Sequence, residues 1–181
     1  MKPLDIFFQN QRIARAGRFI RGGTTVLDIG ARDGALFRRL KQIRMGVGID
    51  PMVPEVIRGA NYILLPGRFP EALPPGETFD VVTMLAVIEH MDTSQHSGID
   101  QLCARQLNPG GLLILTVPSR RVDSILTVLK KLRLIDGQNI EEHHGFDPET
   151  TPDIFPPPRF RLRHHGTFQM GFNHLYVFEK T

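Results

Sequence analysis

The sequence has little cysteine and no long apolar run. Cys103 is the only cysteine among 181 residues, so no internal disulfide framework can form and a reducing compartment is expected. No window approaches the roughly 20 apolar residues of a membrane-spanning helix. Residues 1–23 also contain no apolar stretch long enough for a signal peptide. These absences predict a cytoplasmic protein without a transmembrane segment.

A strong excess of charge of either sign is also missing. Lys and Arg number 22 against 19 Asp and Glu, a mild excess that gives no argument for a nucleic-acid partner. Four arginines recur every three residues in the first predicted helix, at Arg12, Arg15, Arg18 and Arg21. They spread around the helix, which favours a solvated face over a binding patch. Without repeats, low-complexity tracts or a long linker, the chain suits one domain over residues 1–181.

Apolar runs of strand length alternate with helical patterns along the chain. The runs predict strands over 25–29, 45–49, 62–65, 79–85 and 112–117, and the patterns predict helices within 4–20, 32–42, 99–107 and 121–135. Two extended segments follow, over 160–164 and 173–178, joined by a turn that contains Gly171. The alternation predicts an α/β fold: a seven-stranded, mostly parallel sheet with helices on both faces and an antiparallel strand pair at its C-terminal edge.

The segment Val26–Gly34, with the sequence VLDIGARDG, runs from a predicted strand through a tight turn into a predicted helix. Gly30 and Gly34 remove side chains where backbone must approach a ligand closely. The next strand ends at Asp50, about 20 residues after the acidic residue of the first strand, where a carboxylate can accept hydrogen bonds from both hydroxyls of a ribose. The pattern predicts an adenosine-type ligand at the carboxyl edge of the sheet.

Nicotinamide and flavin dinucleotides are rival ligands for such a turn. They prefer the motif G-x-G-x-x-G, but with Gly30 as its first glycine the other two glycine positions hold Arg32 and Ala35. The spacing that the sequence does satisfy is acid-x-Gly-x-x-x-Gly, from Asp28 to Gly34. A dinucleotide-dependent oxidoreductase remains the alternative, together with a non-catalytic module of the same fold that only binds the ligand.

Four segments together resemble the class I S-adenosylmethionine-dependent methyltransferases, and most closely the bacterial type 11 group that includes quinone-biosynthesis enzymes. They are Val26–Gly34, Gly48–Pro51, Phe79–His90 and Leu107–Leu112, in the family's order within about residues 20–120. The resemblance implies a Rossmann-like fold. It also implies S-adenosylmethionine as the methyl donor, S-adenosylhomocysteine as the product, and transfer to a small or medium-sized acceptor.

The resemblance also assigns roles to individual residues. In the first turn, Gly30, Ala31 and Gly34 would lie along the cofactor. Asp28 would anchor the turn and the methionine amino end, and Asp50 would hold the ribose hydroxyls.

Further along the chain, the backbone carbonyls of Leu85 and Ala86 would face the methionine ammonium. Ile49 and Phe69 would enclose the adenine. Two departures from the family pattern are Arg32 and Arg68. Arg32 replaces a glycine. Arg68 replaces a residue that is often acidic, and an arginine side chain has no hydrogen-bond acceptor.

Two classes of acceptor are disfavoured by motifs that the sequence lacks. The Asn/Asp-Pro-Pro-aromatic motif of base-amino methylases is absent after the predicted strand 79–85, and Cys103 is not at a strand end as cytosine-carbon methylases require. A metabolite, lipid or glycan remains, methylated on O, N or C. Where the acceptor must lose a proton, His90 and His143 are the candidate bases.

The segment 119–158 is longer than ordinary connections, and we expect it to form a substrate lid. It contains the run Glu141–His144, which looks like a metal cluster. Adjacent residues do not converge on one ion, so we expect a solvated loop and no metal site there. His164 and His165 are neighbours on a predicted strand and should point to opposite faces.

Overall fold

The computed structural model describes residues 3–91, 93–119 and 146–181. Its centre is an eight-stranded sheet with the order β3-β4-β2-β1-β5-β6-β8-β7. The strands are β1 (Thr25–Ile29), β2 (Met45–Asp50), β3 (Ile57–Arg58), β4 (Tyr62–Pro66), β5 (Phe79–Leu85), β6 (Leu107–Pro118), β7 (Phe160–Phe168) and β8 (Asn173–Lys180). The five strands β4, β2, β1, β5 and β6 are parallel, and β8 pairs antiparallel with both β6 and β7. This confirms the predicted fold class and adds the two-residue antiparallel strand β3.

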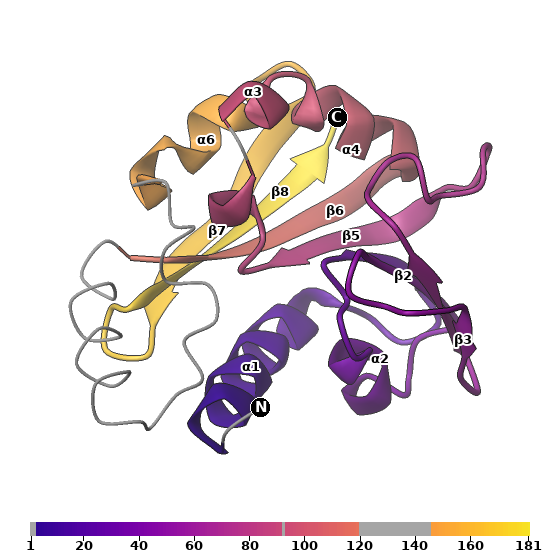
Figure 1. The fold of residues 1–181 in the computed structure, drawn as a ribbon. Helices are drawn as coiled ribbons and strands as arrows, with labels where there is room; N and C mark the ends of the chain where they lie inside the picture. The colour runs from indigo at the N-terminus through magenta and orange to yellow at the C-terminus, as the bar shows by residue number, and fades with distance from the viewer. Residues whose placement is uncertain (1–2, 92, 120–145) are drawn as a thin grey trace.

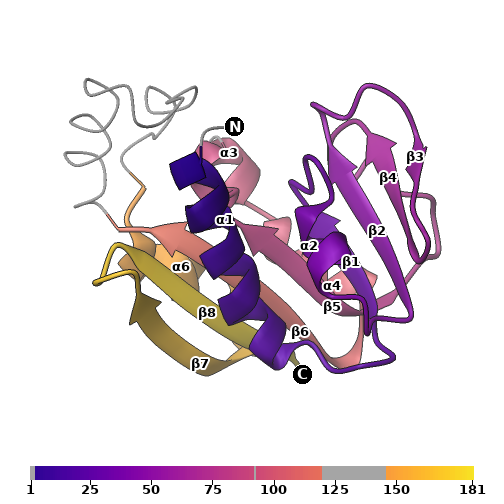
Figure 2. The ribbon, with the colours of Figure 1, turned by 90° about the horizontal axis from the view of Figure 1, so that it is seen from below.

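Helices cover both faces of the sheet, as Figure 1 shows. Those described are α1 (Pro3–Ala16), α2 (Ala35–Arg39), α3 (Thr93–His96), α4 (Ile99–Gln106) and α6 (Thr151–Ile154), with the 3-10 turns η1 (Gly17–Phe19), η2 (Ile88–His90) and η4 (Pro148–Thr150). Seen from below, α1 and α2 lie in front of the sheet, with α3, α4 and α6 behind it (Figure 2). The sheet therefore has a separate apolar core on each face.

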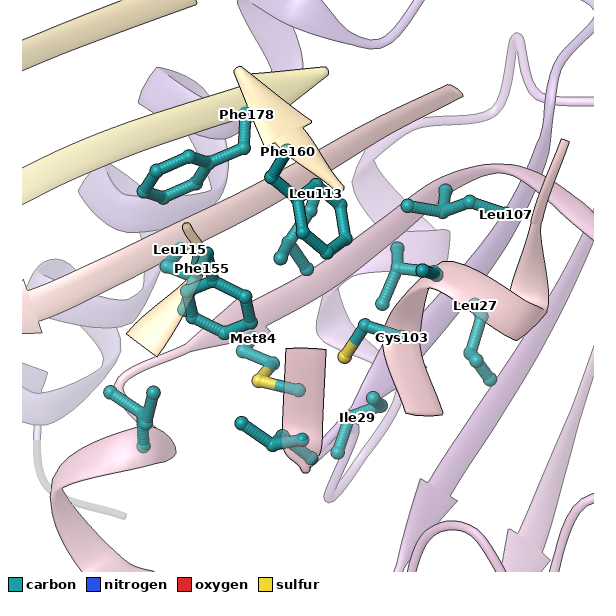
Figure 3. Packing of buried hydrophobic residues seen from close by; sticks show 14 of the residues in the cluster. Leu27, Ile29, Met84, Cys103, Leu107, Leu113, Leu115, Phe155, Phe160 and Phe178 are labelled. Atoms are coloured by element: carbon teal, nitrogen blue, oxygen red, sulfur yellow. The ribbon is translucent and has the colours of Figure 1, made fainter. Parts of the chain in front are cut away.

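The core on the α4 side is rich in aromatic residues, and Figure 3 shows its packing. Phe155, at the end of α6, packs with its ring centroid 5.7 Å from that of Phe160 and 5.4 Å from that of Phe178. Cys103 is fully buried in the same cluster, as expected of a core residue. The aromatic contacts hold α6 and the β7–β8 hairpin to the rest of the sheet.

Two element boundaries differ from the sequence prediction for local reasons. The predicted helix over 32–42 is shorter, Ala35–Arg39, because Arg32 (φ 45°) and Gly34 (φ 72°) adopt the left-handed conformation. Strand β6 begins at Leu107 rather than at 112, so residues 108–111 belong to it. The Asn108 amide donates a 2.8 Å hydrogen bond to Asp80 on β5, where the pairing of the two strands is irregular.

The predicted C-terminal strand pair is present and longer than expected. The turn between the two strands contains Gly171 at φ 86°, as predicted. The helix predicted over 121–135 lies outside the described residues. No helix among the described residues is long and apolar enough to cross a membrane.

Candidate active site

The turn after β1 has left-handed backbone at alternate residues. Gly30 has φ 80° and Arg32 has φ 45°, while the Arg32 side chain is exposed. The N–H groups of Gly30 and Ala31 both donate to the Ile49 carbonyl, at 2.8 and 3.2 Å. The turn is therefore fixed against the end of β2, with the Arg32 side chain facing solvent.

Asp50, at the end of β2, closes this turn from the other side. Its buried carboxylate accepts a 2.9 Å hydrogen bond from the Arg32 N–H and a 2.7 Å hydrogen bond from the Met52 N–H. One oxygen serves each donor. The two strand ends that the sequence pairs as a ligand site are thus in direct contact.

Asp28 lies beneath the turn, in the interior of β1. The Thr83 hydroxyl, on the adjacent strand β5, donates a 2.6 Å hydrogen bond to its carboxylate. Burial raises the pKa of Asp28 to about 7, the Thr83 hydrogen bond opposes the shift, and the negative charge of Asp50 adds to it. A bound cation near Asp28 would favour its ionised form.

Leu85 ends β5 at the same edge of the sheet, and Ala86 follows it. Both are half-buried, and Ala86 adopts φ 60° while its N–H donates to the Thr116 carbonyl at 2.9 Å. The structure therefore brings the carboxyl ends of β1, β2 and β5 together, because these strands are parallel neighbours in the sheet.

The two residues predicted to enclose an adenine differ in their exposure. Ile49 is only 1% exposed, because it packs in the core on the α4 side. Phe69 is half-buried and packs against the same cluster. Met52, which the sequence analysis did not single out, is 73% exposed beside Asp50. No motif marked it; only its position two residues after the strand-end acid could have done so.

Glu89, in the turn η2 after β5, is the least expected feature of this edge. It is 2% exposed, and no other residue of the described chain donates a hydrogen bond to either carboxylate oxygen. Burial raises the pKa of Glu89 to about 7, although its own backbone N–H and the charge of Arg12 lower it. The neighbouring candidate base, His90, is half-buried, and His143 lies outside the described residues.

Arg12, on α1, was expected on a solvated face but is half-buried. Its side chain donates to the Phe8 carbonyl at 3.5 Å. Burial lowers the pKa of Arg12, and the charge of Glu89 opposes that shift. Arg15 is also half-buried, with its guanidinium 5.9 Å from the centroid of the Phe168 ring, whereas Arg18 and Arg21 are exposed as predicted. Spacing alone could not separate Arg12 from them, because Glu89, whose charge acts on Arg12, is distant in sequence.

A family model described as a methyltransferase domain matches residues 8–152, more than half of the chain. The chain belongs to the methyltransferase-domain family. The predicted enzyme class is thereby confirmed, while the bacterial type 11 subgroup stays a prediction. No curated protein matches this methyltransferase.

Solved structures share the fold of this methyltransferase at low sequence identity. The N-methyltransferase NodS from Bradyrhizobium japonicum WM9, in complex with S-adenosyl-L-homocysteine, is 15% identical, with a TM-score of 0.66 over 96% of this chain and 87% of that one. An S-adenosylmethionine-dependent methyltransferase from Methanosarcina mazei is 18% identical, with a TM-score of 0.63 over 91% and 95% of the two chains. An O-methyltransferase family protein from Burkholderia thailandensis is 17% identical, with a TM-score of 0.67 over 97% of this chain and 56% of that one.

Proposed function

We propose that this methyltransferase binds S-adenosylmethionine at the carboxyl ends of β1, β2 and β5 and transfers its methyl group to a small or medium-sized acceptor. The observation that carries the proposal is the contact between the left-handed turn after β1 and the Asp50 carboxylate. A carboxylate offers about four lone-pair positions, of which the two backbone donors occupy two. Asp50 therefore keeps acceptor capacity for the two hydroxyls of a ribose.

The remaining residues of the edge fit the rest of the same ligand. Asp28, buried and held by Thr83, would balance the positive methionine ammonium, with the carbonyls of Leu85 and Ala86 as acceptors. The adenine would lie against Phe69 and the exposed Met52. Ile49 would contribute through its backbone carbonyl, which already fixes Gly30 and Ala31.

The sulfonium of S-adenosylmethionine supplies a methyl group on a good leaving group. The protein is left to align the acceptor with the sulfur–methyl bond and to exclude water. A general base is needed only for an acceptor that loses a proton on methylation. Glu89 joins His90 and His143 as a candidate, because a carboxyl with a pKa of about 7 can accept a proton at neutral pH.

The acceptor class is a metabolite, lipid or glycan. The similar structures include an N-methyltransferase and an O-methyltransferase family protein, so the fold serves either acceptor atom. We assign acceptor selectivity to residues 119–158. The described part of this segment includes the buried Thr151 and Phe155, which anchor its end to the sheet.

Calorimetry with S-adenosylhomocysteine and with NAD tests the cofactor assignment. We expect binding of the former only; binding of NAD alone would favour the oxidoreductase alternative. Acceptor screening with a labelled methyl donor then tests catalysis. Cofactor binding with no transfer to any metabolite, lipid or glycan acceptor would favour a non-catalytic binding module.

A further inference from the structure

Three side chains with metal-binding atoms meet at the C-terminal edge of the sheet, outside the proposed cofactor site. They are Glu149 of η4, His165 of β7 and His174 of β8, and their ligand atoms all lie within 4.8 Å of one another. His165 Nε2 is 3.1 Å from His174 Nδ1, and Glu149 Oε1 is 3.7 Å from the same His174 nitrogen. Two imidazoles bound tetrahedrally at 2.0–2.1 Å place their nitrogens about 3.3 Å apart. Small side-chain rotations therefore suffice to place one ion between them.

Contacts with neighbouring residues hold the metal-binding side chains in place without any ion. The His165 ring stacks on Tyr176, with the ring centroids 4.2 Å apart. The Tyr176 hydroxyl donates a 2.9 Å hydrogen bond to the Pro148 carbonyl, directly before Glu149. The Asp147 carboxylate accepts the Glu149 N–H at 3.2 Å. These contacts hold η4 against the β7–β8 hairpin, so the ligand set is assembled before a metal arrives.

The hydrogen bonding and the exposure of the cluster also suit a metal. In the metal-free state one histidine donates its ring N–H to the other, and an ion would take the place of that shared proton. Glu149 is exposed, so water can reach the fourth coordination position. Two nitrogen ligands and one oxygen ligand favour zinc over magnesium or calcium.

We propose that Glu149, His165 and His174 form a zinc site that joins η4 to the β7–β8 hairpin. The proposal does not depend on methyl transfer. His174 pairs with Val117 near the carboxyl end of β6. The ion would therefore hold η4, and with it the segment that begins at residue 146, at this end of the sheet. The site differs from the run Glu141–His144, which the sequence presents as the more obvious metal motif.

Zinc titration of the untagged full chain by calorimetry, with cobalt absorption spectra as a second readout, tests the site. We expect one zinc ion per chain and the visible absorption bands of tetrahedral cobalt. His165→Asn and Glu149→Gln should each weaken zinc binding at least tenfold. Both side chains are exposed, so the variants should fold.

His164→Asn is the matched control. His164 is the exposed neighbour of His165 and contacts Phe19, on the α1 side of the sheet, with ring centroids 5.0 Å apart. Its replacement should leave zinc affinity within about twofold. Absence of zinc binding, or binding that His165→Asn leaves unchanged, would overturn the proposal. Loss of binding in a His143→Asn, His144→Asn double variant would place the ion elsewhere and would overturn it equally.

Discussion

Thr83 and Asp28 lie directly opposite each other on the parallel strands β5 and β1, and the Thr83 hydroxyl donates a 2.6 Å hydrogen bond to the buried Asp28 carboxylate. The bond opposes the effect of burial, which raises the pKa of Asp28 to about 7. The pair therefore keeps a carboxylate available beneath the proposed cofactor site, in a place where burial alone would favour its protonation.

Replacing Thr83 with valine should remove that hydrogen bond and leave the carboxyl without a donor. We expect the free energy of unfolding to fall by about 1–3 kcal/mol and the affinity for S-adenosylhomocysteine at pH 7.5 to fall several-fold. Urea unfolding and calorimetry measure the two effects. Thr116→Val is the control, because the buried Thr116 hydroxyl has no hydrogen-bond partner in the described part of the chain. That variant should be as stable as the wild type or more stable, and equal losses in both variants would contradict the role of Thr83.

Asp50→Ala should weaken S-adenosylhomocysteine binding at least tenfold, because two hydrogen bonds to the ribose would be lost. The structure adds a second consequence. The same carboxylate accepts the N–H groups of Arg32 and Met52, so thermal stability should fall as well. Asp33→Asn, at an exposed acid of the same turn that pairs with Arg38, should leave affinity within about twofold. Unchanged affinity in Asp50→Ala would refute the ribose assignment.

Gly30→Ala should destabilise the protein through Val87. A Cβ atom on Gly30 would lie 2.4 Å from Val87 Cγ2, in a backbone conformation of φ 80°. Gly23→Ala separates the two causes, since Gly23 has nearly the same φ, 78°, with nothing within 4 Å of an added Cβ. In the Gly23 variant the left-handed conformation should cost about 1–2 kcal/mol of stability, which the lower chain entropy of alanine offsets by about 0.5–1 kcal/mol. The Gly30 variant should lose clearly more and should also bind S-adenosylhomocysteine poorly; equal losses in urea unfolding would rule out the Val87 contact as the cause.

How far the sequence predicts this molecule depends on whether a feature is local. The strand Thr25–Ile29 and the turn at Gly30 follow from a short pattern, and the structure places them as expected. The length of α2 was overestimated because helical spacing does not show that Arg32 is left-handed. The strand β3 was missed because it has only two residues, both exposed.

Apart from Met52, the features of the site that were missed depend on contacts between distant residues. Thr83 reads as part of an apolar run until its partner across the strands is known. Glu89 reads as a loop residue until its burial near Arg12 is seen. His165 and His174 meet only through strand pairing, whereas the adjacent histidines at 143 and 144 attract attention in the sequence. A pattern along the chain cannot supply such pairs.

Arg32→Gly should leave cofactor binding intact. Arg32 adopts φ 45° with an exposed side chain, so glycine removes a left-handed strain of about 1–2 kcal/mol and restores a cost of about 0.5–1 kcal/mol in chain entropy. The expected net change in the free energy of unfolding is therefore between zero and about 1.5 kcal/mol of stabilisation. A large loss of S-adenosylhomocysteine affinity, measured by calorimetry, would show that the guanidinium contacts the ligand.

Glu89 makes the stability of the protein depend on pH in a predictable direction. Its pKa rises from the ordinary value of 4.5 to about 7 on folding, mainly through burial. Between these values the folded state binds more protons than the unfolded state, so the free energy of unfolding falls as pH rises from about 4.5 to 7. Glu89→Gln removes this titration, and its melting temperature should decline less than that of the wild type between pH 5 and pH 8. Asp28 titrates in the same window and remains in both proteins, so the comparison isolates Glu89. If the melting temperatures of the two proteins change in parallel across this range, the pKa of Glu89 is not raised on folding, and the basis for its proposed role as a proton acceptor is removed.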